Sequence, residues 1–437
     1  MSRKREIITI IDSDEEGSQK RQNLCGQDNQ RIKDTSRKRL SYSKGRVFLV
    51  KLGPFTALEN SVSFEELVVG HGSEKIKKAV MTTFVLDYEW LRGKLGNNVN
   101  LCLVINFEKD KDYKVEVKRL DENTVIVAPP QTKSRFGIFH PKIMVLWFET
   151  FVRIVISSAN LIALDWEVMQ NILFVQDFPL LTEKTEKKDV SEFGCDIIQF
   201  FEAIKVPEQV LEAIEKIDFS TAKYRALASI PGKFPINEAK YGYLGLSKAL
   251  SEKNFSGEVE YAFTHCSSVG FIDNEWYMEL CSKLFSGFAF KILYPTTNMV
   301  SDSLLGEESV CSLFFSKHAY LNRNFPKKIL YSYKATSKGA LSHCKLLFCR
   351  FKGQNKGWLY LGSHNMSKAA WGKSTRGSLS QFEIGNTEIG ALLPVTYIEN
   401  KPYLAEDFVK FEALSEIPLP FELDFKPYST ADVPWTT

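Results

Sequence analysis

Two stretches of this chain repeat one pattern, and the repeat restricts its possible folds more than any other feature. The first reads IFHPKIMVLWFETFVRIVISSANLIALDW, and the second reads LSHCKLLFCRFKGQNKGWLYLGSHNMSKAAW. Each has His-x-Lys at the head of an apolar strand, a polar turn, and a second apolar strand that ends in an Asn followed six residues later by a Trp. Corresponding residues lie 203 to 205 positions apart. The pattern indicates an internal duplication of a strand-turn-strand-helix unit.

The rest of the body alternates short β-branched runs with longer amphipathic stretches. VFLVKL, NLCLVINF and TVIVAPP are such runs, and VPEQVLEAIEKIDF has helical spacing. Strands separated by helical spans predict an α/β chain with mixed sheets. Strand-like runs resume near residue 222, so we place a boundary near residue 217 and expect domains at 44–217 and 218–437.

Residues 1–43 differ in composition and are predicted to be a disordered tail. They are rich in Ser, Asp, Gln, Asn, Lys and Arg and hold almost no aromatic residue, so they cannot bury enough surface to fold. Residues 1–45 hold 11 Lys and Arg against 7 Asp and Glu, which leaves 45 against 46 in the remainder of the chain. A near-neutral body predicts that any nucleic acid is held in a local groove and not on a broad basic face.

Two kinds of short motif stand out in this tail. The segment that begins at Ile7 and ends at Glu16 is an apolar run followed by an acidic run, a pattern typical of SUMO-interacting motifs that add a strand to the modifier's sheet. The alternative is a sticky tail segment, which would be an aggregation hazard without a partner. The basic clusters at 3–5 and 37–39 are typical of nuclear-import signals, although solvated charge runs of this size are common.

Cysteine usage and hydropathy exclude several classes of protein. The eight cysteines form no C-x-x-C pair and the six histidines are scattered, so neither a zinc cluster nor a disulfide framework is indicated. This usage fits a reducing cytosolic or nuclear setting. The sequence has no apolar stretch of 18 residues and no secretory pattern at its N-terminus, so we expect neither membrane spanning nor secretion.

The duplicated residues suit the chemistry of a phosphate diester. Alternate side chains of a strand share one face, so each His points the same way as its Lys, and each Asn closes the neighbouring strand. Joining the two units would assemble two imidazoles, two ammonium groups and two amides, from His140, Lys142, Asn160, His343, Lys345 and Asn365. Lys and Asn can donate to phosphate oxygens without a metal, while one imidazole is a nucleophile and the other an acid. Each residue alone could be structural, and Asn before a helix is a common cap, but six at matched spacing favour a site.

Duplicated His-x-Lys with a downstream Asn is similar to the phospholipase D superfamily, whose ordinary members carry an Asp five residues after the Lys. Trp147 and Arg350 stand at those positions here. Together with SSANLIALDW, GSHNMSKAAWG, SIPGKF at 229–234 and the ending from Asp432 to Trp435, this resembles the tyrosyl-DNA phosphodiesterase family, in a fungal-type form, over most of residues 46–435. The resemblance implies two similar α/β/α sandwich domains with mixed sheets, an active site at their interface, and neither metal nor cofactor.

The resemblance also implies a reaction. The family releases a topoisomerase I tyrosine or peptide from a DNA 3′ end in DNA repair and leaves a 3′ phosphate. His140 would attack phosphorus and become a covalent phosphohistidine, and His343 would protonate the departing tyrosine and then activate water. The phosphate-binding groups would be Lys142, Lys345, Asn160 and Asn365.

Two more residues are implied to orient the histidines. Glu388, in NTEIGALLP, matches the family carboxylate that holds the nucleophile, and its alternative reading is a sheet-edge charge. Gln170 resembles the glutamine that orients the second histidine, but it lies one residue early when counted from Asn160. Asn171 and Gln176 therefore stay open as alternatives.

Two positions are implied to contact DNA. Phe136 matches an aromatic that stacks on a base, with core packing as its alternative, and Ser367 could donate to a neighbouring phosphate or cap a helix. Pro141 removes a backbone donor, so it should lie at an unpaired point or at the start of its strand. The expected partner is a DNA 3′ end, mainly single-stranded, carrying tyrosine or a topoisomerase I peptide; a nuclear monomer is expected.

Two other functions fit these residues less well. Another phospholipase D superfamily hydrolase, such as a nuclease or lipid phosphodiesterase, is disfavoured by the missing Asp pair and the lack of an amphipathic anchor. A catalytically inactive scaffold that binds DNA ends is disfavoured by the presence of both His140 and His343. Metal dependence and product formation in EDTA would distinguish the tyrosyl-DNA phosphodiesterase from the other hydrolase and from the inactive scaffold.

Overall fold

The structure is a computed structural model that describes residues 40–55, 58–70, 74–106, 115–130, 137–181, 190–307, 312–375 and 381–437. The motif that begins at Ile7, both basic clusters and Phe136 lie outside the described residues. Across the described part of the chain, no helix is long and apolar enough to cross a membrane.

The first half of the chain forms a nine-stranded mixed sheet in the order β2-β1-β9-β8-β7-β3-β4-β6-β5. Its strands are β1 (Arg46–Val50), β2 (Ser61–Val62), β3 (Lys78–Thr83), β4 (Asn100–Ile105), β5 (Glu116–Asp121), β6 (Thr124–Ala128), β7 (Ile143–Trp147), β8 (Phe151–Ser157) and β9 (Ile172–Pro179). Strands β7, β8 and β9 are buried along their whole length. β7 is a continuous apolar run, whereas β8 and β9 also contain the buried ion pair of Arg153 with Asp177.

The second half forms a ten-stranded sheet in the order β23-β22-β21-β18-β17-β12-β14-β16-β24, with β10 paired to β21. Its strands are β10 (Arg225–Ser229), β12 (Val259–His265), β14 (Lys291–Leu293), β16 (Leu330–Ser332), β17 (Leu346–Phe351), β18 (Lys356–Gly362), β21 (Glu388–Ile398), β22 (Lys401–Ala405), β23 (Ala413–Glu416) and β24 (Lys426–Pro427). The predicted boundary near residue 217 lies between the last strand of the first sheet and the first strand of the second.

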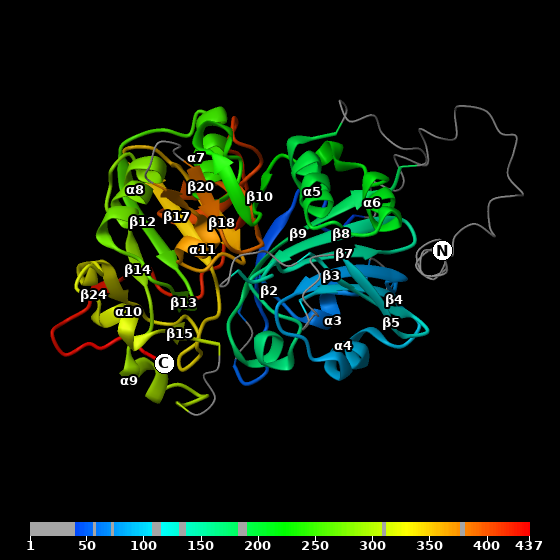
Figure 1. Ribbon diagram of the computed structural model, residues 1–437, viewed down its shortest axis with the longest axis horizontal. Coiled ribbons are helices and arrows are strands. Elements are labelled where there is room, and N and C mark those ends of the chain that lie inside the picture. The colour runs from blue at the N-terminus through cyan, green and yellow to red at the C-terminus, as the bar shows by residue number, and fades with distance from the viewer. Residues whose placement is uncertain are drawn as a thin grey trace, which may run out of the picture.

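The two sheets repeat one topology. The path β9-β8-β7-β3-β4-β6 in the first corresponds to β21-β18-β17-β12-β14-β16 in the second. In both, the first three pairings along the path are antiparallel and the last two are parallel. The predictions of an α/β class, mixed sheets and an internal duplication are confirmed, and Figure 1 shows the two halves side by side.

Helices cover the sheets on both sides. Among the described residues, the helices of eight or more residues are α4 (Tyr88–Leu95), α5 (Glu192–Ala203), α6 (Glu208–Glu215), α7 (Gly242–Glu252) and α8 (Asn274–Phe285). Helix α4 packs on the outer face of the first sheet with α3 (Phe64–Leu67), and α7 and α8 pack on the outer face of the second. Helices α5 and α6 cover a core that contains inner side chains of both sheets, such as Phe174 and Phe348. The two halves therefore fold around a shared apolar centre.

Shorter elements lie at the edges. A three-stranded sheet is made by β11 (Gly232–Pro235), β19 (Lys373–Thr375) and β20 (Gln381–Ile384), and β13 (Ser268–Val269) pairs with β15 (Phe314–Phe315). The remaining short α-helices are α9 (Thr297–Ser301), α10 (Lys317–Leu321) and α11 (Lys368–Trp371). A π-helical turn spans Leu164–Val168, and single 3₁₀ turns span Phe219–Thr221, Ile236–Glu238 and Lys327–Ile329.

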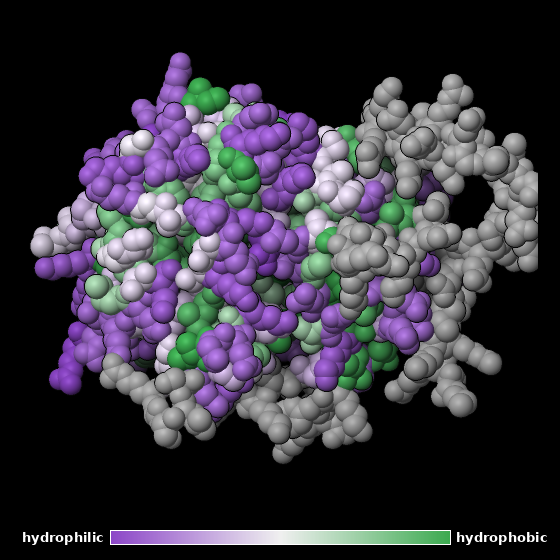
Figure 2. Space-filling view, turned by 90° about the horizontal axis from the view of Figure 1, so that it is seen from above, coloured by the Kyte–Doolittle hydropathy of each residue, from purple (hydrophilic) through white to green (hydrophobic). Residues whose placement is uncertain are grey.

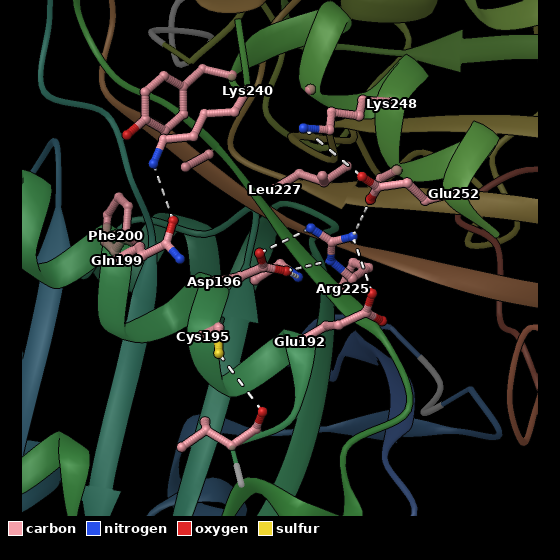
Figure 3. Close-up of a pocket in the computed structure, with 16 residues that line it drawn as sticks. Glu192, Cys195, Asp196, Gln199, Phe200, Arg225, Leu227, Lys240, Lys248 and Glu252 are labelled. Carbon is pink, nitrogen blue, oxygen red and sulfur yellow. Dashed lines mark hydrogen bonds and ion pairs between the residues drawn. The ribbon is translucent and has the colours of Figure 1, made fainter. Parts of the chain in front are cut away.

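A polar cleft of about 290 Å³ lies between α5 and α7, where the two halves of the chain meet (Figure 3). Its central cation, Arg225, sits 2.7 Å from a carboxylate oxygen of Asp196 and 3.2 Å from one of Glu252. These contacts join β10 to both helices and satisfy the guanidinium. The cleft is therefore a joint between the domains, and it lies apart from the duplicated motifs.

The face seen in Figure 2 is mainly hydrophilic, with hydrophobic areas small and separated from one another. Burial shows the same division between surface and core. Whole strands are buried, whereas each of the longer helices has one buried face and one exposed face. On this face, polar side chains thus cover the apolar core of both halves.

Candidate active site

Each His-x-Lys motif lies in an extended stretch that ends where β7 or β17 begins. The backbone N–H of His140 donates to the carbonyl of Thr387 (2.9 Å), and that of His343 donates to the carbonyl of Gln170 (2.8 Å). Short parallel bridges between the halves accompany both bonds. Pro141 lies in this unpaired stretch, as predicted. Because each motif is fixed by the opposite half, docking of the two sheets brings the motifs to one place.

The first histidine is held by a carboxylate from the second half. Nδ1 of His140 lies 2.8 Å from Oε2 of Glu388, and both side chains are almost completely buried. Ser363 donates to the same oxygen (2.6 Å), and the amide of Asn386 donates to Oε1 (3.0 Å). Burial acts to raise the pKa of Glu388, but the charge and hydrogen bond of His140, together with the charges of His364 and Lys142, lower that pKa to about 2. The anionic carboxylate fixes the His140 tautomer with Nε2 left for chemistry.

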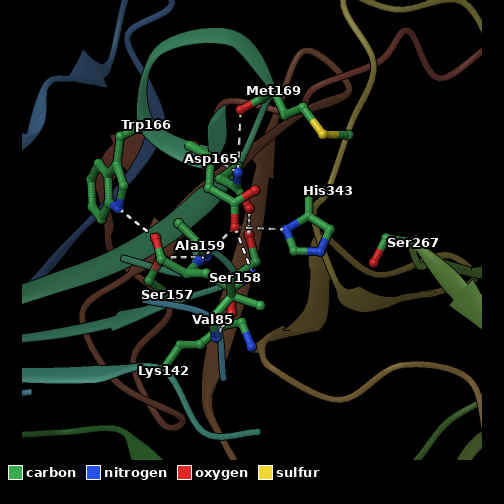
Figure 4. Close-up of polar contacts among 12 residues, drawn as sticks. Val85, Lys142, Ser157, Ser158, Ala159, Asp165, Trp166, Met169, Ser267 and His343 are labelled. Atoms are coloured by element: carbon green, nitrogen blue, oxygen red, sulfur yellow. Dashed lines mark hydrogen bonds and ion pairs between the residues drawn. The ribbon is translucent and has the colours of Figure 1, made fainter. Parts of the chain in front are cut away.

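The second histidine is held by a carboxylate from the first half. Oδ2 of Asp165 lies 3.1 Å from Nδ1 of His343, and Figure 4 shows the carboxylate turned toward the ring. The angle of this contact falls outside hydrogen-bond geometry, a looseness common in catalytic contacts before substrate binds. Burial lowers the pKa of His343 to about 4, although Asp165 acts to raise it. Burial likewise lowers the pKa of His140, against the effect of Glu388.

Asp165 is placed by the π-helical turn that follows Asn160. Its Oδ2 accepts both the backbone N–H (2.6 Å) and the side-chain amide (2.9 Å) of Asn160, while the indole of Trp166 donates to the Asn160 carbonyl (2.8 Å). Burial acts to raise the pKa of Asp165, but His343 and Lys345 lower it overall. A π turn at this point is typical of functional sites, where one extra residue redirects a side chain.

The two lysines of the duplicated motifs are buried. Lys142 and Lys345 are 1% and 0% exposed, and each Nζ donates to the carbonyl of the histidine two residues earlier. Neither has a carboxylate within ion-pair distance among the described residues. Burial, with repulsion from Lys345 next, lowers the pKa of Lys142 to about 7, and burial lowers that of Lys345 to about 8. Two such ammonium groups form a site that an anion would stabilise.

The two asparagines are oriented by their neighbours. Oδ1 of Asn365 accepts the N–H of Ser268 (3.0 Å) and the hydroxyl of Ser267 (3.2 Å), so its NH₂ group faces away from both. Oδ1 of Asn160 accepts the N–H of Val85 (3.3 Å), and one amide hydrogen goes to Asp165. A backbone N–H can only donate, so these contacts fix which amide atom is oxygen. Both side chains retain an amide hydrogen for a phosphate oxygen.

The contacts of Gln170 correct the prediction that its side chain orients the second histidine. Its amide Nε2 donates to the carbonyl of Val50 (2.8 Å), so only its backbone carbonyl meets His343. The alternatives also point elsewhere: Asn171 donates to the carbonyl of Asp165 and Gln176 to that of Ser43. The group beside Nδ1 of His343 is the Asp165 carboxylate, because the π turn directs it inward.

Of the two residues predicted to contact DNA, the structure describes only Ser367. Phe136 lies outside the described residues, so its stacking stays a prediction. Ser367 is the N-cap of α11 and accepts the N–H of Ala370 (3.1 Å), which leaves its hydroxyl hydrogen for another acceptor. His364, which directly precedes Asn365 in the sequence, is fixed between Ser229 and Tyr360 in the core.

Asp165 and the groups that hold the orienting residues in place were not predicted from the sequence. Asp165 could have been noticed as a single acid in the apolar stretch ANLIALDW, five residues after Asn160. Ser363 and Asn386 carry no such signal, because polar residues beside a motif are common. In the described part of the chain, no group of three or more His, Cys, Asp or Glu is placed to hold a metal ion.

Comparison with known proteins adds independent information. The sequence model of the family described as "Tyrosyl-DNA phosphodiesterase" matches residues 56–429, most of the chain. The chain belongs to the tyrosyl-DNA phosphodiesterase family. Members of this family are phosphodiester hydrolases, so the predictions of the family and of an enzyme are confirmed.

Individual relatives agree with this assignment. The chain is 27% identical to Tyrosyl-DNA phosphodiesterase 1 of Arabidopsis thaliana, over 90% of this chain and 73% of that protein. It is 22% identical to a probable tyrosyl-DNA phosphodiesterase of Caenorhabditis elegans, over 90% and 89%. The crystal structure of the yeast tyrosyl-DNA phosphodiesterase superposes with a TM-score of 0.67 at 18% identity, covering 90% of this chain and 99% of that one. The last comparison supports the predicted fold.

Proposed function

We propose that this protein hydrolyses the bond between a tyrosine and a DNA 3′ phosphate, as a DNA-repair enzyme that acts on topoisomerase I adducts. The observation that carries the proposal is the pair of buried lysines, Lys142 and Lys345, which have no carboxylate partner among the described residues and flank two carboxylate-held histidines. A phosphate diester supplies the missing negative charge. Its arrival would also raise the histidine pKa values, because it offsets the repulsion between imidazolium and ammonium groups.

In the first step, Nε2 of His140 attacks phosphorus and the bond to the tyrosine oxygen breaks. Glu388 holds the other ring nitrogen, so the attacking nitrogen carries a lone pair. His343 gives its proton to the departing phenolate oxygen. Charge on the non-bridging oxygens is stabilised by Lys142 and Lys345 together with the two asparagine amides.

In the second step, His343 is neutral and takes a proton from water. The resulting hydroxide attacks the phosphorus of the phosphohistidine, the bond to His140 breaks, and a DNA 3′ phosphate leaves. Asp165 stabilises the imidazolium that forms on His343. The two histidines thus exchange acid and base roles between the steps, and the enzyme returns to its starting protonation state.

The test is incubation of the full chain, in EDTA, with a single-stranded oligonucleotide carrying a 3′ phosphotyrosine, followed by a denaturing gel. We expect conversion to a 3′ phosphate, and its complete loss in His140→Ala. His265→Ala is the matched control, since that histidine is buried against the Cys344 carbonyl and Tyr333. A folded protein that binds the oligonucleotide without converting it would favour the DNA-end scaffold, and a metal requirement would favour another hydrolase of the superfamily.

We also propose that the substrate is mainly single-stranded and that the enzyme acts as a monomer. The near-neutral body supports a local groove that engages a few nucleotides, and both halves of the site come from one chain. Phe136 and Ser367 are proposed to contact the strand. Comparison of single-stranded and blunt duplex substrates, together with the mass in solution at working concentration, tests both statements.

For the tail we propose nuclear localisation and SUMO binding. The basic clusters and the segment that begins at Ile7 support these functions by sequence alone. Deletion of residues 1–43 is expected to remove SUMO binding in a pulldown and to leave turnover unchanged. Unchanged SUMO binding would contradict the motif, and unchanged nuclear fluorescence of a tagged deletion variant would contradict the import signal.

A further inference from the structure

The loop that follows β18 holds two groups of the active site. Ser363 donates to the carboxylate of Glu388 (2.6 Å), the group that orients the nucleophilic histidine. Asn365 offers its amide to a phosphate oxygen. His364 lies between these two residues and is 4% exposed. Any shift of His364 would therefore turn both neighbours.

The first half of the chain has the same loop with one difference. Its residues are Ser158-Ala159-Asn160, against Ser363-His364-Asn365 in the second half. In each loop the serine N–H donates to an isoleucine carbonyl (3.0 Å in both), and that isoleucine donates back to the serine hydroxyl, at 3.1 Å from Ile172 and 3.0 Å from Ile389. The backbones thus correspond residue by residue. What differs is the middle side chain, a methyl group in the first loop and an imidazole in the second.

Each loop has a Trp six residues after its Asn, but the two indoles act differently. In the first half, the indole of Trp166 donates to the carbonyl of Asn160 (2.8 Å). The indole nitrogen of Trp371 is buried without a hydrogen-bond partner among the described residues. Its ring instead lies 4.4 Å from that of His364, at an interplanar angle of 36°. The second loop thus lacks the direct indole bond and is held through its histidine.

Both ring nitrogens of His364 are hydrogen-bonded, and counting protons fixes their roles. The hydroxyl of Ser229 donates its single hydrogen to the carbonyl of Ala370 (2.6 Å), so its oxygen accepts from Nε2 of His364 (2.9 Å). Burial lowers the pKa of His364 to about 4, so the ring is neutral near pH 7 and Nδ1 carries a lone pair. Nδ1 therefore accepts from the hydroxyl of Tyr360. These bonds tie the loop to β10, β18 and α11.

Tyr360 reaches His364 because a glycine lies beneath its ring. A Cβ placed on Gly390 would lie 2.2 Å from the Tyr360 ring, so a larger residue there would displace the ring. Gly390 is the third residue of β21, two positions after Glu388. The tyrosine thus crosses the strand that carries the orienting carboxylate and ends at His364.

We infer that His364 is a positioning residue, which fixes the loop after β18 with Asn365 turned to the reacting phosphate and Ser363 turned to the orienting carboxylate. It acts through these neighbours and is not itself a catalytic residue. A doubly hydrogen-bonded imidazole suits this task, because buried polar networks that are fully satisfied fix one conformation. The inference rests on the proposed function, since it concerns the asparagine that would bind the phosphate.

The test separates positioning from stability, with the 3′ phosphotyrosyl oligonucleotide as substrate. His364→Phe retains a ring beside Trp371 but leaves the Tyr360 hydroxyl buried without its acceptor, so it should lower the urea midpoint of unfolding. Tyr360→Phe/His364→Phe removes that hydroxyl as well, so the midpoint should return toward the wild-type value. In both variants kcat should be roughly ten- to a hundredfold low, the range for a lost hydrogen bond to a charged group. KM should change less, because Asn365 acts on charge that grows in the transition state.

Two single variants extend the test. Tyr360→Phe leaves the His364 ring in place and removes one of its two hydrogen bonds, so it covers the case in which neither histidine variant folds, and its kcat should fall. Tyr277→Phe is the matched control. It removes a buried hydroxyl on α8 that donates to the carbonyl of Phe290 (2.6 Å), so it should lower stability and leave kcat unchanged.

A binding measurement needs no turnover. A mononucleotide with a 3′ phosphate presents a phosphate to Asn365, and its affinity is measured by titration calorimetry. Asn365→Ala should weaken binding, and Tyr360→Phe/His364→Phe should weaken it by a similar factor. Tyr277→Phe should bind the mononucleotide as the wild type does.

Each outcome decides the inference. A low kcat at restored stability supports it. Recovery of kcat together with stability in the double variant would make His364 a packing residue and overturn it, as would an affinity for the 3′ phosphate that falls only in Asn365→Ala. A kcat in Tyr360→Phe equal to that of Tyr277→Phe would also overturn it. If wild type does not cleave the tyrosyl substrate, the proposed function fails, while binding of the 3′ phosphate still tests the loop.

Discussion

Replacement of Asp165 by asparagine tests the cross-domain arrangement most directly. The change removes one charge from a position 3.1 Å from the His343 ring and retains a carbonyl oxygen for the two Asn160 donors. At an effective dielectric constant of about 20, a charge pair at this separation is worth roughly 5 kcal/mol. A neutral hydrogen bond from the substituted amide would return about 1 kcal/mol. The imidazolium of His343 should therefore lose about 4 kcal/mol of stabilisation.

This loss predicts a fall of about a thousandfold in the rate of the first step with a tyrosyl leaving group, since 1.36 kcal/mol is one decade in rate. The pKa of His343 would fall below its present value of about 4, because the group that raises it is gone. Protonated His343 is then populated only at lower pH, so the rate should recover as the pH is lowered from 7 toward 5. Hydrolysis of the covalent adduct would slow as well, because His343 becomes a weaker base for activating water.

The assay is single-turnover cleavage of two oligonucleotides across pH 5 to 8, one with a 3′ phosphotyrosine and one with a 3′ p-nitrophenyl phosphate. Nitrophenolate leaves without a proton, so its release should be nearly unaffected while tyrosine release collapses. Equal effects on both leaving groups would refute the reasoning. Asp177→Asn is the control: Asp177 is a buried acid 2.7 Å from Arg153 in the first sheet, so the change should lower stability and leave the leaving-group ratio unchanged.

Three further predictions follow from the site. In His343→Ala, p-nitrophenyl substrate should yield a trapped covalent adduct on a denaturing gel that resolves slowly, and absence of adduct would contradict the division of roles between the histidines. In Glu388→Gln, His140 loses the carboxylate that fixes its tautomer, so kcat should fall about 10²- to 10⁴-fold with KM little changed in steady-state kinetics; a change confined to KM would argue against it. In Lys142→Met, removal of a buried cation should raise the free energy of unfolding by about 1 to 3 kcal/mol at pH 7 while turnover is lost, as measured by urea denaturation. The folded pKa of Lys142 is about 7 against 10.5 in the unfolded chain, so the unfolded state binds more protons between these values. Wild-type stability should rise from pH 7 to 9, and this rise should be smaller in the variant.

The alternation of strands and helices was predictable because it depends on the local spacing of apolar residues. A continuous apolar run such as β7 is buried on both faces, so its sequence indicates a strand without knowledge of the partner strands. The duplication was also visible, since the two motifs recur at a nearly constant offset. These features depend on residue order alone.

The direction of side chains in irregular segments was not predictable. The sequence placed Gln170 near the second histidine, and its backbone is indeed there, but its amide turns to Val50. Outside regular strands, one residue of shift or one π turn reverses which side chain faces the site. Counting from Asn160 therefore identified the correct region of the chain but the wrong side chain.

The sequence by itself determined the class of fold, the duplicated His, Lys and Asn set, and the family. Only the tertiary structure decided how the two sets face each other. His140 is held by Glu388 and His343 by Asp165, so each half supplies the carboxylate that the other half needs. Such pairings join residues more than 170 positions apart. The family resemblance implied the pairing of His140 with Glu388, but no local pattern encodes either one, because they arise when the apolar inner faces of the two sheets pack into one core.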